Sequence, residues 1–122
     1  MRGVGKKVWA IAEGWIPQGD GFADRALASH ETACILNAGD SDAHIELTVF
    51  FADREPVRYE LTVPARRTKH VRFDDLTNPA VPRGTDYASL FVSDVPVVVQ
   101  HTRLDSRKAE IALMTTLAYG EG

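Results

Sequence analysis

Alternation of apolar and polar residues at every second position is the feature that most constrains the fold of this chain. The alternation is clearest in residues 43–51 and 57–63, where one face of each segment is apolar and the other is mostly polar. Because side chains of a β-strand point to opposite faces in turn, a period of two indicates strands. A short polar turn at residues 53–56 joins the two segments, and together they predict a β-hairpin.

Strand-like segments recur along the whole chain, and no convincing helical periodicity interrupts them. The predicted strands are residues 7–12, 31–37, 43–51, 57–63, the basic segment after Pro64, 87–93, 96–104 and 109–119. Turns are predicted at Ser93–Asp94 and around residues 105–107, and a helical turn at Asp75–Leu76. This spacing of short strands predicts an all-β, antiparallel β-sandwich or barrel, with residues 1–122 forming a single domain.

Composition agrees with an ordinary globular protein. The chain has 122 residues, of which 44% are hydrophobic and 25% charged, so one domain with a sizeable core is expected. Its apolar runs are too short to cross a bilayer, and no signal-peptide core follows the basic N-terminal residues, so we expect a cytoplasmic protein. The single cysteine, Cys34, excludes an internal disulfide and, within an apolar run, indicates a small buried residue.

Several predicted strands carry apolar residues on both faces. These stretches are residues 50–51, 90–92 and 97–99. In a two-layer sandwich only one face of a strand contacts the core, so the other face needs a second cover. That cover is either another subunit or a loop or N-terminal segment folded over the sheet. We expect self-association.

Residues 63–73 (VPARRTKHVRF) form a basic segment in a chain whose net charge is −3. The segment holds Arg66, Arg67, Lys69 and Arg72 and no acidic residue. Two interpretations are open: a solvated outer face of a sheet, or a row of side chains that binds an anion, a sugar or an acidic partner. DNA binding ranks third among the possible functions, because the negative net charge argues against a general nucleic-acid binder.

No pattern typical of catalysis or metal binding is found in the sequence. The four histidines have no His-x-His or His-x-x-x-His spacing that would bring two metal ligands together. Ser29 and His30 are adjacent, but neighbours on a strand point to opposite faces and cannot share a proton. Nucleophile-elbow, phosphate-loop and dinucleotide motifs are absent. We therefore expect no enzymatic activity, no catalytic metal and no cofactor.

Residues 100–107 (QHTRLDSR) form a second polar segment, directly after an apolar strand. Here Arg103 and Asp105 predict either an ion pair that fixes a turn or a guanidinium presented to a ligand. If this segment lies near the basic segment, one surface would offer hydrogen bonds to hydroxyls, carboxylates or phosphates, with the loop at residues 18–28 or a tryptophan ring at its edge. The predicted ligand- or partner-binding residues are Arg66, His70, Gln100, His101, Arg103 and Trp15.

Four segments resemble the signature blocks of the sensory rhodopsin transducer family in order and spacing. They are WAIAEGWIP (9–17), SHETACILNAGDSDAH (29–44), VPARRTKHVRF (63–73) and VVVQHTRLDSR (97–107). The resemblance implies a small soluble β-sandwich of jelly-roll type that assembles as a homotetramer. It also implies a fold similar to carbohydrate-binding modules and a role without catalysis.

The resemblance and the residues together predict a non-enzymatic cytoplasmic module for signalling and binding. In one type of member, the resemblance implies, the partner is the cytoplasmic face of a membrane rhodopsin, whose signal the protein relays. The alternative is a protein that binds a small polar ligand, such as a sugar or an anionic metabolite, without any rhodopsin. The sequence leaves these two functions open.

Overall fold

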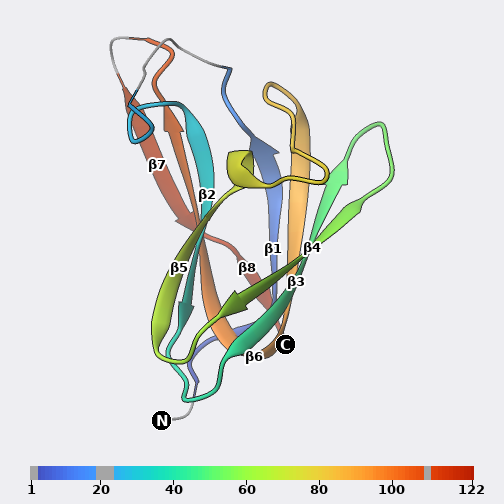
Figure 1. Cartoon of the computed structure of the whole chain (residues 1–122), viewed down its shortest axis with the longest axis vertical. Helices are drawn as coiled ribbons and strands as arrows, with labels where there is room; N and C mark the ends of the chain where they lie inside the picture. The colour runs from blue at the N-terminus through green and yellow to red at the C-terminus, as the bar shows by residue number, and fades with distance from the viewer. Residues whose placement is uncertain (1–2, 19–23, 109–110) are drawn as a thin grey trace.

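Two antiparallel β-sheets that share one long strand make up the fold (Figure 1). The computed structural model describes residues 3–18, 24–108 and 111–122. Sheet A has the strand order β4-β3-β6-β1-β8, and sheet B has the order β5-β2-β6-β7. The predicted all-β antiparallel sandwich is confirmed.

The strands are short except for one. They are β1 (Lys6–Trp15), β2 (His30–Asn37), β3 (Ala43–Phe51), β4 (Val57–Val63), β5 (Arg67–Arg72), β6 (Asp86–Asp105), β7 (Ala112–Leu117) and β8 (Tyr119–Glu121). The β3–β4 hairpin has the predicted bounds. The one helical turn described, the 3₁₀ helix η1 (Phe73–Asp75), begins two residues before the predicted turn at Asp75–Leu76 and overlaps it only at Asp75. Two predicted segments, the loop 18–28 and the strand 109–119, are only partly within the described residues, because residues 19–23 and 109–110 lie outside them. The prediction of one strand at 109–119 is wrong in the described part, because β7 pairs with β6 whereas β8 pairs with β1.

Strand β6 belongs to both sheets. Its first part pairs with β1 and β3, and its second part, from Val98 onward, pairs with β2 and β7. The prediction of two strands separated by a turn at Ser93–Asp94 is wrong. The strand continues through these residues and bends there, as it leaves sheet A and enters sheet B (Figure 1). Turn-forming residues suit this bend: Asp94 accepts a hydrogen bond from the backbone N–H of His44 at 2.8 Å, and Pro96 has no N–H to satisfy.

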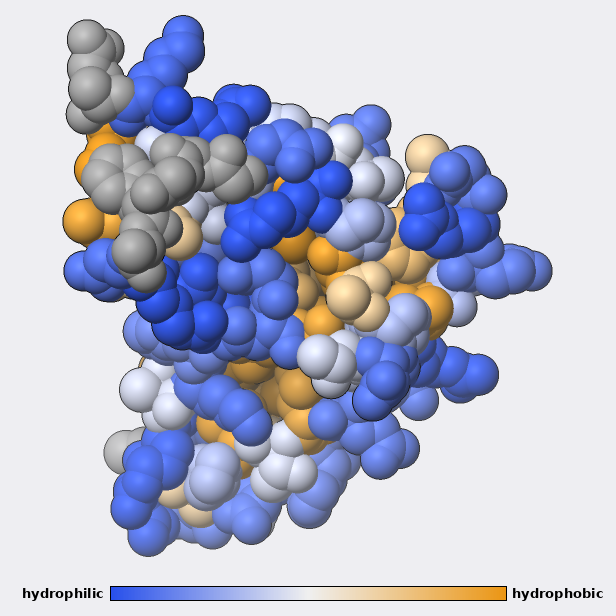
Figure 2. Space-filling model, turned by 45° about the horizontal axis from the view of Figure 1, so that its top comes forward, coloured by the Kyte–Doolittle hydropathy of each residue, from blue (hydrophilic) through white to orange (hydrophobic). Residues whose placement is uncertain are grey.

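Apolar side chains fill the space between the sheets and are visible between the two layers in Figure 2. Phe91, Val97 and Val99 are fully buried, and each contributes about 1.5–3 kcal/mol to folding. On the outer face of sheet A, Val92 and Phe50 remain 43% and 40% exposed. The outer face of the isolated chain is therefore partly apolar, and the covering of this face by a second subunit stays a prediction.

Two further expectations concern the architecture. Jelly-roll connectivity and a single domain spanning residues 1–122 both stay predictions. Across the described residues, no helix has the length and apolar character needed to cross a membrane.

Candidate functional site

A fully buried carboxylate, Glu31, lies at the centre of the most elaborate polar network among the described residues. Its position on β2 has the same parity as Ala33 and Ile35, so its side chain points between the sheets. Each carboxylate oxygen accepts two hydrogen bonds. Oε1 accepts from the Tyr87 hydroxyl and, at 2.9 Å, from the backbone N–H of Trp15, and Oε2 accepts from His101 Nε2 at 3.1 Å and Arg103 Nε at 2.5 Å.

The donors determine the ionisation of this carboxyl group. Burial alone would raise the pKa of Glu31, but the hydrogen bonds from His101, Tyr87 and Arg103 lower it below its ordinary value. Burial, together with the negative charge of Glu31, raises the pKa of Tyr87. Glu31 is therefore a carboxylate at neutral pH, and Tyr87 remains a hydroxyl that donates to it.

Arg103 extends the network to the opposite sheet. Its Nη2 donates to both carboxylate oxygens of Glu13 on β1, at 2.8 and 3.0 Å. Burial lowers the pKa of Arg103, but the hydrogen bonds to Glu13 and Glu31 outweigh this effect and raise it. One guanidinium thus holds two carboxylates, an arrangement that its fork of N–H groups favours and a lysine cannot reproduce.

A groove of about 230 Å³ opens beside this network, between β1 and β7. It is lined by residues 10–13 of β1, by His101, by Met114 and by residues 116–119. His101 is buried and uses Nε2 for Glu31, and its other ring nitrogen, Nδ1, has no hydrogen-bond partner among the described residues. The groove therefore combines mostly apolar walls with the imidazole ring of His101 and the side chain of Glu13, a combination typical of small ligand sites.

Three of the six predicted site residues meet at the Glu31 network. His101 and Arg103 both point to the inner side of sheet B, because they lie two positions apart on the strand. Trp15, at the end of β1, donates its backbone N–H to Glu31, and its half-buried ring lies 4.8 Å from the guanidinium of Arg107. The predicted Arg103–Asp105 ion pair is not found, because Asp105 pairs with Arg107 at 2.7 Å.

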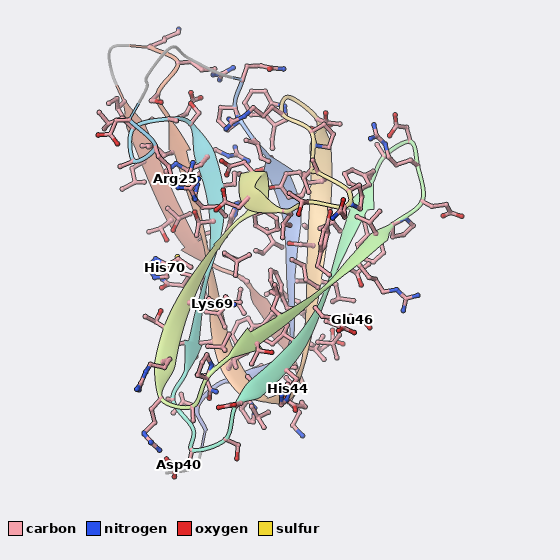
Figure 3. The ribbon with its side chains drawn as sticks, viewed as in Figure 1. Arg25, Asp40, His44, Glu46, Lys69 and His70 are labelled. Atoms are coloured by element: carbon pink, nitrogen blue, oxygen red, sulfur yellow. The ribbon has the colours of Figure 1, made fainter. Side chains whose placement is uncertain are left out.

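The other three predicted residues lie elsewhere, so the six do not form one surface. His70 and Gln100 are exposed on the outer face of sheet B, on either side of Cys34, and Figure 3 shows His70 pointing away from the sandwich. Cys34, predicted to be buried, is only half-buried on this face. The separation follows from strand geometry, because the adjacent residues Gln100 and His101 must face opposite sides. A binding role for each of the six stays a prediction.

The basic segment is held largely by its own neighbours. Arg66 lies in the β4–β5 turn, with φ of 55°, and pairs with Asp40 at 2.9 Å. Arg72 pairs with Asp74 at 3.0 Å, and Nζ of Lys69 donates to the carbonyl of Thr62 at 3.1 Å. The two ion pairs, at Arg66 and Arg72, leave less net positive charge for an external anion than the sequence suggested.

The sequence alone does not identify Glu31, Tyr87 and Glu13 as members of the site. For Glu31 a signal existed, since an acidic residue at an inward position of an apolar strand needs buried donors. No equivalent signal marks Tyr87 or Glu13, whose proximity depends on strand pairing. Among the described residues, no group of three or more His, Cys, Asp or Glu side chains is arranged to hold a metal ion.

Comparisons with known proteins give one consistent result. The family described as "Anabaena sensory rhodopsin transducer" matches residues 4–120. The solved structure titled "Anabaena sensory rhodopsin transducer" is 61% identical, with 88% of this chain and 95% of that chain covered and a TM-score of 0.75. The crystal structure of Thermotoga maritima 1070 is 38% identical, with 96% of each chain covered and a TM-score of 0.84. No curated protein matches the sequence.

Proposed function

The chain belongs to the sensory rhodopsin transducer family, and from this premise we propose that it is a non-enzymatic signalling and binding module of the cytoplasm. Its partner, in this proposal, is the cytoplasmic face of a membrane rhodopsin. The observation that carries the proposal is the 61% identity to the Anabaena sensory rhodopsin transducer over 88% of the chain.

The Glu31 network supports a binding role better than a catalytic one. Both oxygens of the Glu31 carboxylate are occupied by donors, and the pKa of Glu31 is lowered, so this group is a poor proton acceptor at neutral pH. Tyr87, with its raised pKa, is held as a donor to the same carboxylate. The network is therefore a rigid set of hydrogen bonds that holds β1, β2 and β6 together. Such rigidity suits a protein that presents a fixed binding surface.

We also propose that the working form is a homotetramer. A single chain exposes large apolar side chains at Val92 and Phe50 and along β7. Apolar surface of this kind typically marks contact with another protein. A relay protein gains from such assembly, because several copies can respond together to one input.

A second candidate function is the binding of a small polar ligand, and the groove between β1 and β7 favours it. His101 and Glu13 bring an imidazole ring and an acidic group to a groove with mostly apolar walls. A hydroxylated metabolite would satisfy both groups. DNA binding gains no such support, since Arg66 and Arg72 are already paired with Asp40 and Asp74.

Co-sedimentation with membranes tests the primary proposal. The full chain is mixed with lipid vesicles that contain Anabaena sensory rhodopsin with its cytoplasmic side outward, and with vesicles of the same lipid without protein. We expect the chain to sediment only with the rhodopsin vesicles. Equal amounts in the two pellets would contradict the proposed partner.

A further inference from the structure

The outer face of sheet A carries a hollow that lies apart from the Glu31 network. It has a volume of about 440 Å³ and is lined by residues 44–46 of β3, residues 60–62 of β4 and residues 92–94 of β6. The side chains of Glu46 and Glu60 at its rim are exposed, and Figure 3 shows Glu46 pointing away from the sandwich. The hollow is therefore accessible to a partner.

Apolar and acidic side chains share this part of the surface. Val92, which is 43% exposed, supplies an apolar patch, and Glu46, Glu60 and Asp94 supply three carboxylates. A second hollow, of about 510 Å³, shares Glu46 and adds the carboxylate of Glu55. The outer side of the β3–β4 hairpin thus has two adjoining hollows, each with at least two acidic residues in its lining.

Neighbouring cations neutralise these carboxylates only in part. Glu46 lies 3.9 Å from Arg58, and Asp94 pairs with His44 at 2.8 Å. Glu60 lies directly opposite Glu46 in the pairing of β3 with β4 and forms no ion pair within the part of the chain that the structure describes. Like charges directly opposite each other destabilise a sheet. A cationic group bound between the two glutamates would remove this repulsion.

The outer face of sheet B has a different character. Within the described ranges of β2, β5, β7 and the second part of β6, no carboxylate points to this face. Its ionisable side chains include Arg72 and His70. Of the two outer faces described, that of sheet A is therefore the one whose charge is complementary to a basic partner.

We propose that the outer face of sheet A, around Glu46, Glu60 and Val92, binds the Lys- and Arg-rich cytoplasmic loops of the rhodopsin. Cytoplasmic loops of membrane proteins carry an excess of these residues. Their charged groups reach the carboxylates of the hollows while their aliphatic stems cover Val92. Anionic lipid repels the same face, so the contact is with protein rather than lipid. This docking surface rests on the proposed rhodopsin partner and names the face of the chain that contacts it.

Two lysine variants at matched positions test the docking surface. Thr62 lines the first hollow on β4, and Thr68 lies on the outer face of sheet B on β5; both are exposed. Thr62→Lys brings a positive charge to the acidic face, whereas Thr68→Lys brings the same charge to a face without carboxylates. The full chain is titrated onto Anabaena sensory rhodopsin in lipid nanodiscs. We expect Thr62→Lys to raise the dissociation constant at least about tenfold and Thr68→Lys to leave it unchanged.

Glu60→Gln separates binding from stability. Because Glu60 faces the like charge of Glu46, its neutralisation should leave the urea midpoint unchanged or raise it. The same variant should bind the rhodopsin nanodiscs at least about threefold more weakly, since one carboxylate of the docking surface is lost. Unchanged affinity, or affinity that falls only together with stability, would contradict the proposed role of Glu60.

A photo-cross-link identifies the molecule that covers this face, without a change of charge. In a Cys34→Ser background, Thr62→Cys and Thr68→Cys each carry a benzophenone label. Irradiation of the complex should join the label at position 62, and not the label at position 68, to the rhodopsin. A cross-link from position 62 to a second copy alone would instead support cover by another subunit, and no cross-link from this position would also contradict the proposal.

The outcomes distinguish the docking surface from the partner itself. If the unmodified chain does not bind the rhodopsin nanodiscs, both the partner and the docking surface are wrong. If the unmodified chain binds but folded Thr62→Lys and Glu60→Gln bind equally well, only the docking surface is wrong.

Discussion

The guanidinium of Arg103 and the carboxylate of Glu13 form an ion pair that joins the two sheets. Nη2 of Arg103 lies 2.8 Å from Oε1 and 3.0 Å from Oε2 of Glu13. Glu13 belongs to β1 of sheet A, whereas Arg103 belongs to the part of β6 that lies in sheet B. Since the same guanidinium donates to Glu31 on β2, one side chain connects three strands.

Replacement of Glu31 by glutamine should destabilise the protein strongly. Glu31→Gln leaves Arg103 and His101 facing a neutral amide, and breaking a buried charge pair from one side costs about 3–5 kcal/mol. Glu13→Gln is the matched control, because Glu13 is 67% exposed at its side chain and a surface pair contributes only about 0–1 kcal/mol. Urea unfolding at pH 7 measures both. Equal losses in the two variants would contradict the central position of Glu31.

The stability that Glu31 provides should disappear in acid. The pKa of Glu31 is lowered in the folded state, where burial alone would raise it but hydrogen bonds from His101, Tyr87 and Arg103 prevail. Its contribution is therefore fully present above the ordinary carboxyl pKa of 4.5 and is lost as the pH falls through the lower folded-state value.

The measurement is the difference in unfolding free energy between the unmodified chain and Glu31→Gln from pH 7 to pH 3. Hydrogen bonds from His44 and Arg107 also lower the pKa values of Asp94 and Asp105. Both residues are present in the two proteins, so their contributions to the pH dependence cancel in the difference. We expect the difference to shrink toward low pH. A constant difference would show that ionisation of Glu31 is not the cause.

Arg103→Lys should lower stability without changing affinity for a partner. A lysine ammonium cannot reach both carboxylates in the geometry of the guanidinium, and each lost hydrogen bond to a charged group costs about 1.5–3 kcal/mol. Thermal unfolding and binding to rhodopsin vesicles report the two effects separately. If affinity falls while the melting temperature stays the same, Arg103 contacts the partner directly, as the sequence suggested.

Adjacent positions on β6 should respond very differently to truncation. Phe91 is fully buried between the sheets, so Phe91→Ala should cost about 3–5 kcal/mol. Val92 points outward and is 43% exposed, so Val92→Ala should change the unfolding free energy of a dilute single chain by less than about 0.5 kcal/mol. Similar losses at both positions, measured by urea unfolding, would contradict the assigned orientation of β6.

The sequence predicted those parts of the fold that depend on local pattern. Alternation in residues 43–51 and 57–63 specified β3, β4 and their hairpin, because only the apolar face of each can meet the core. The continuity of β6 could not be predicted, since Ser93, Asp94 and Pro96 have the composition of a turn and only pairing with distant strands keeps the chain extended there.

In the candidate site, too, local pattern could be predicted and contacts between distant strands could not. His101 and Arg103 share a face because they are two positions apart on one strand, which the sequence could show. Their acceptor, Glu31, lies 70 and 72 positions away along the chain, and only the register between β2 and β6 brings it close. The sequence places Arg66 near His101 and Arg103 only through its charge, whereas the tertiary structure holds it in a turn beside Asp40.

Affinity for a rhodopsin in darkness and in light tests the central claim most directly. The full chain is titrated onto Anabaena sensory rhodopsin in lipid nanodiscs, first in darkness and then under continuous illumination, with empty nanodiscs as the control. The account predicts specific binding whose dissociation constant differs between the two conditions, since a relay must change its affinity when its input changes. Absence of binding in both conditions, or the same dissociation constant in darkness and light, would contradict it.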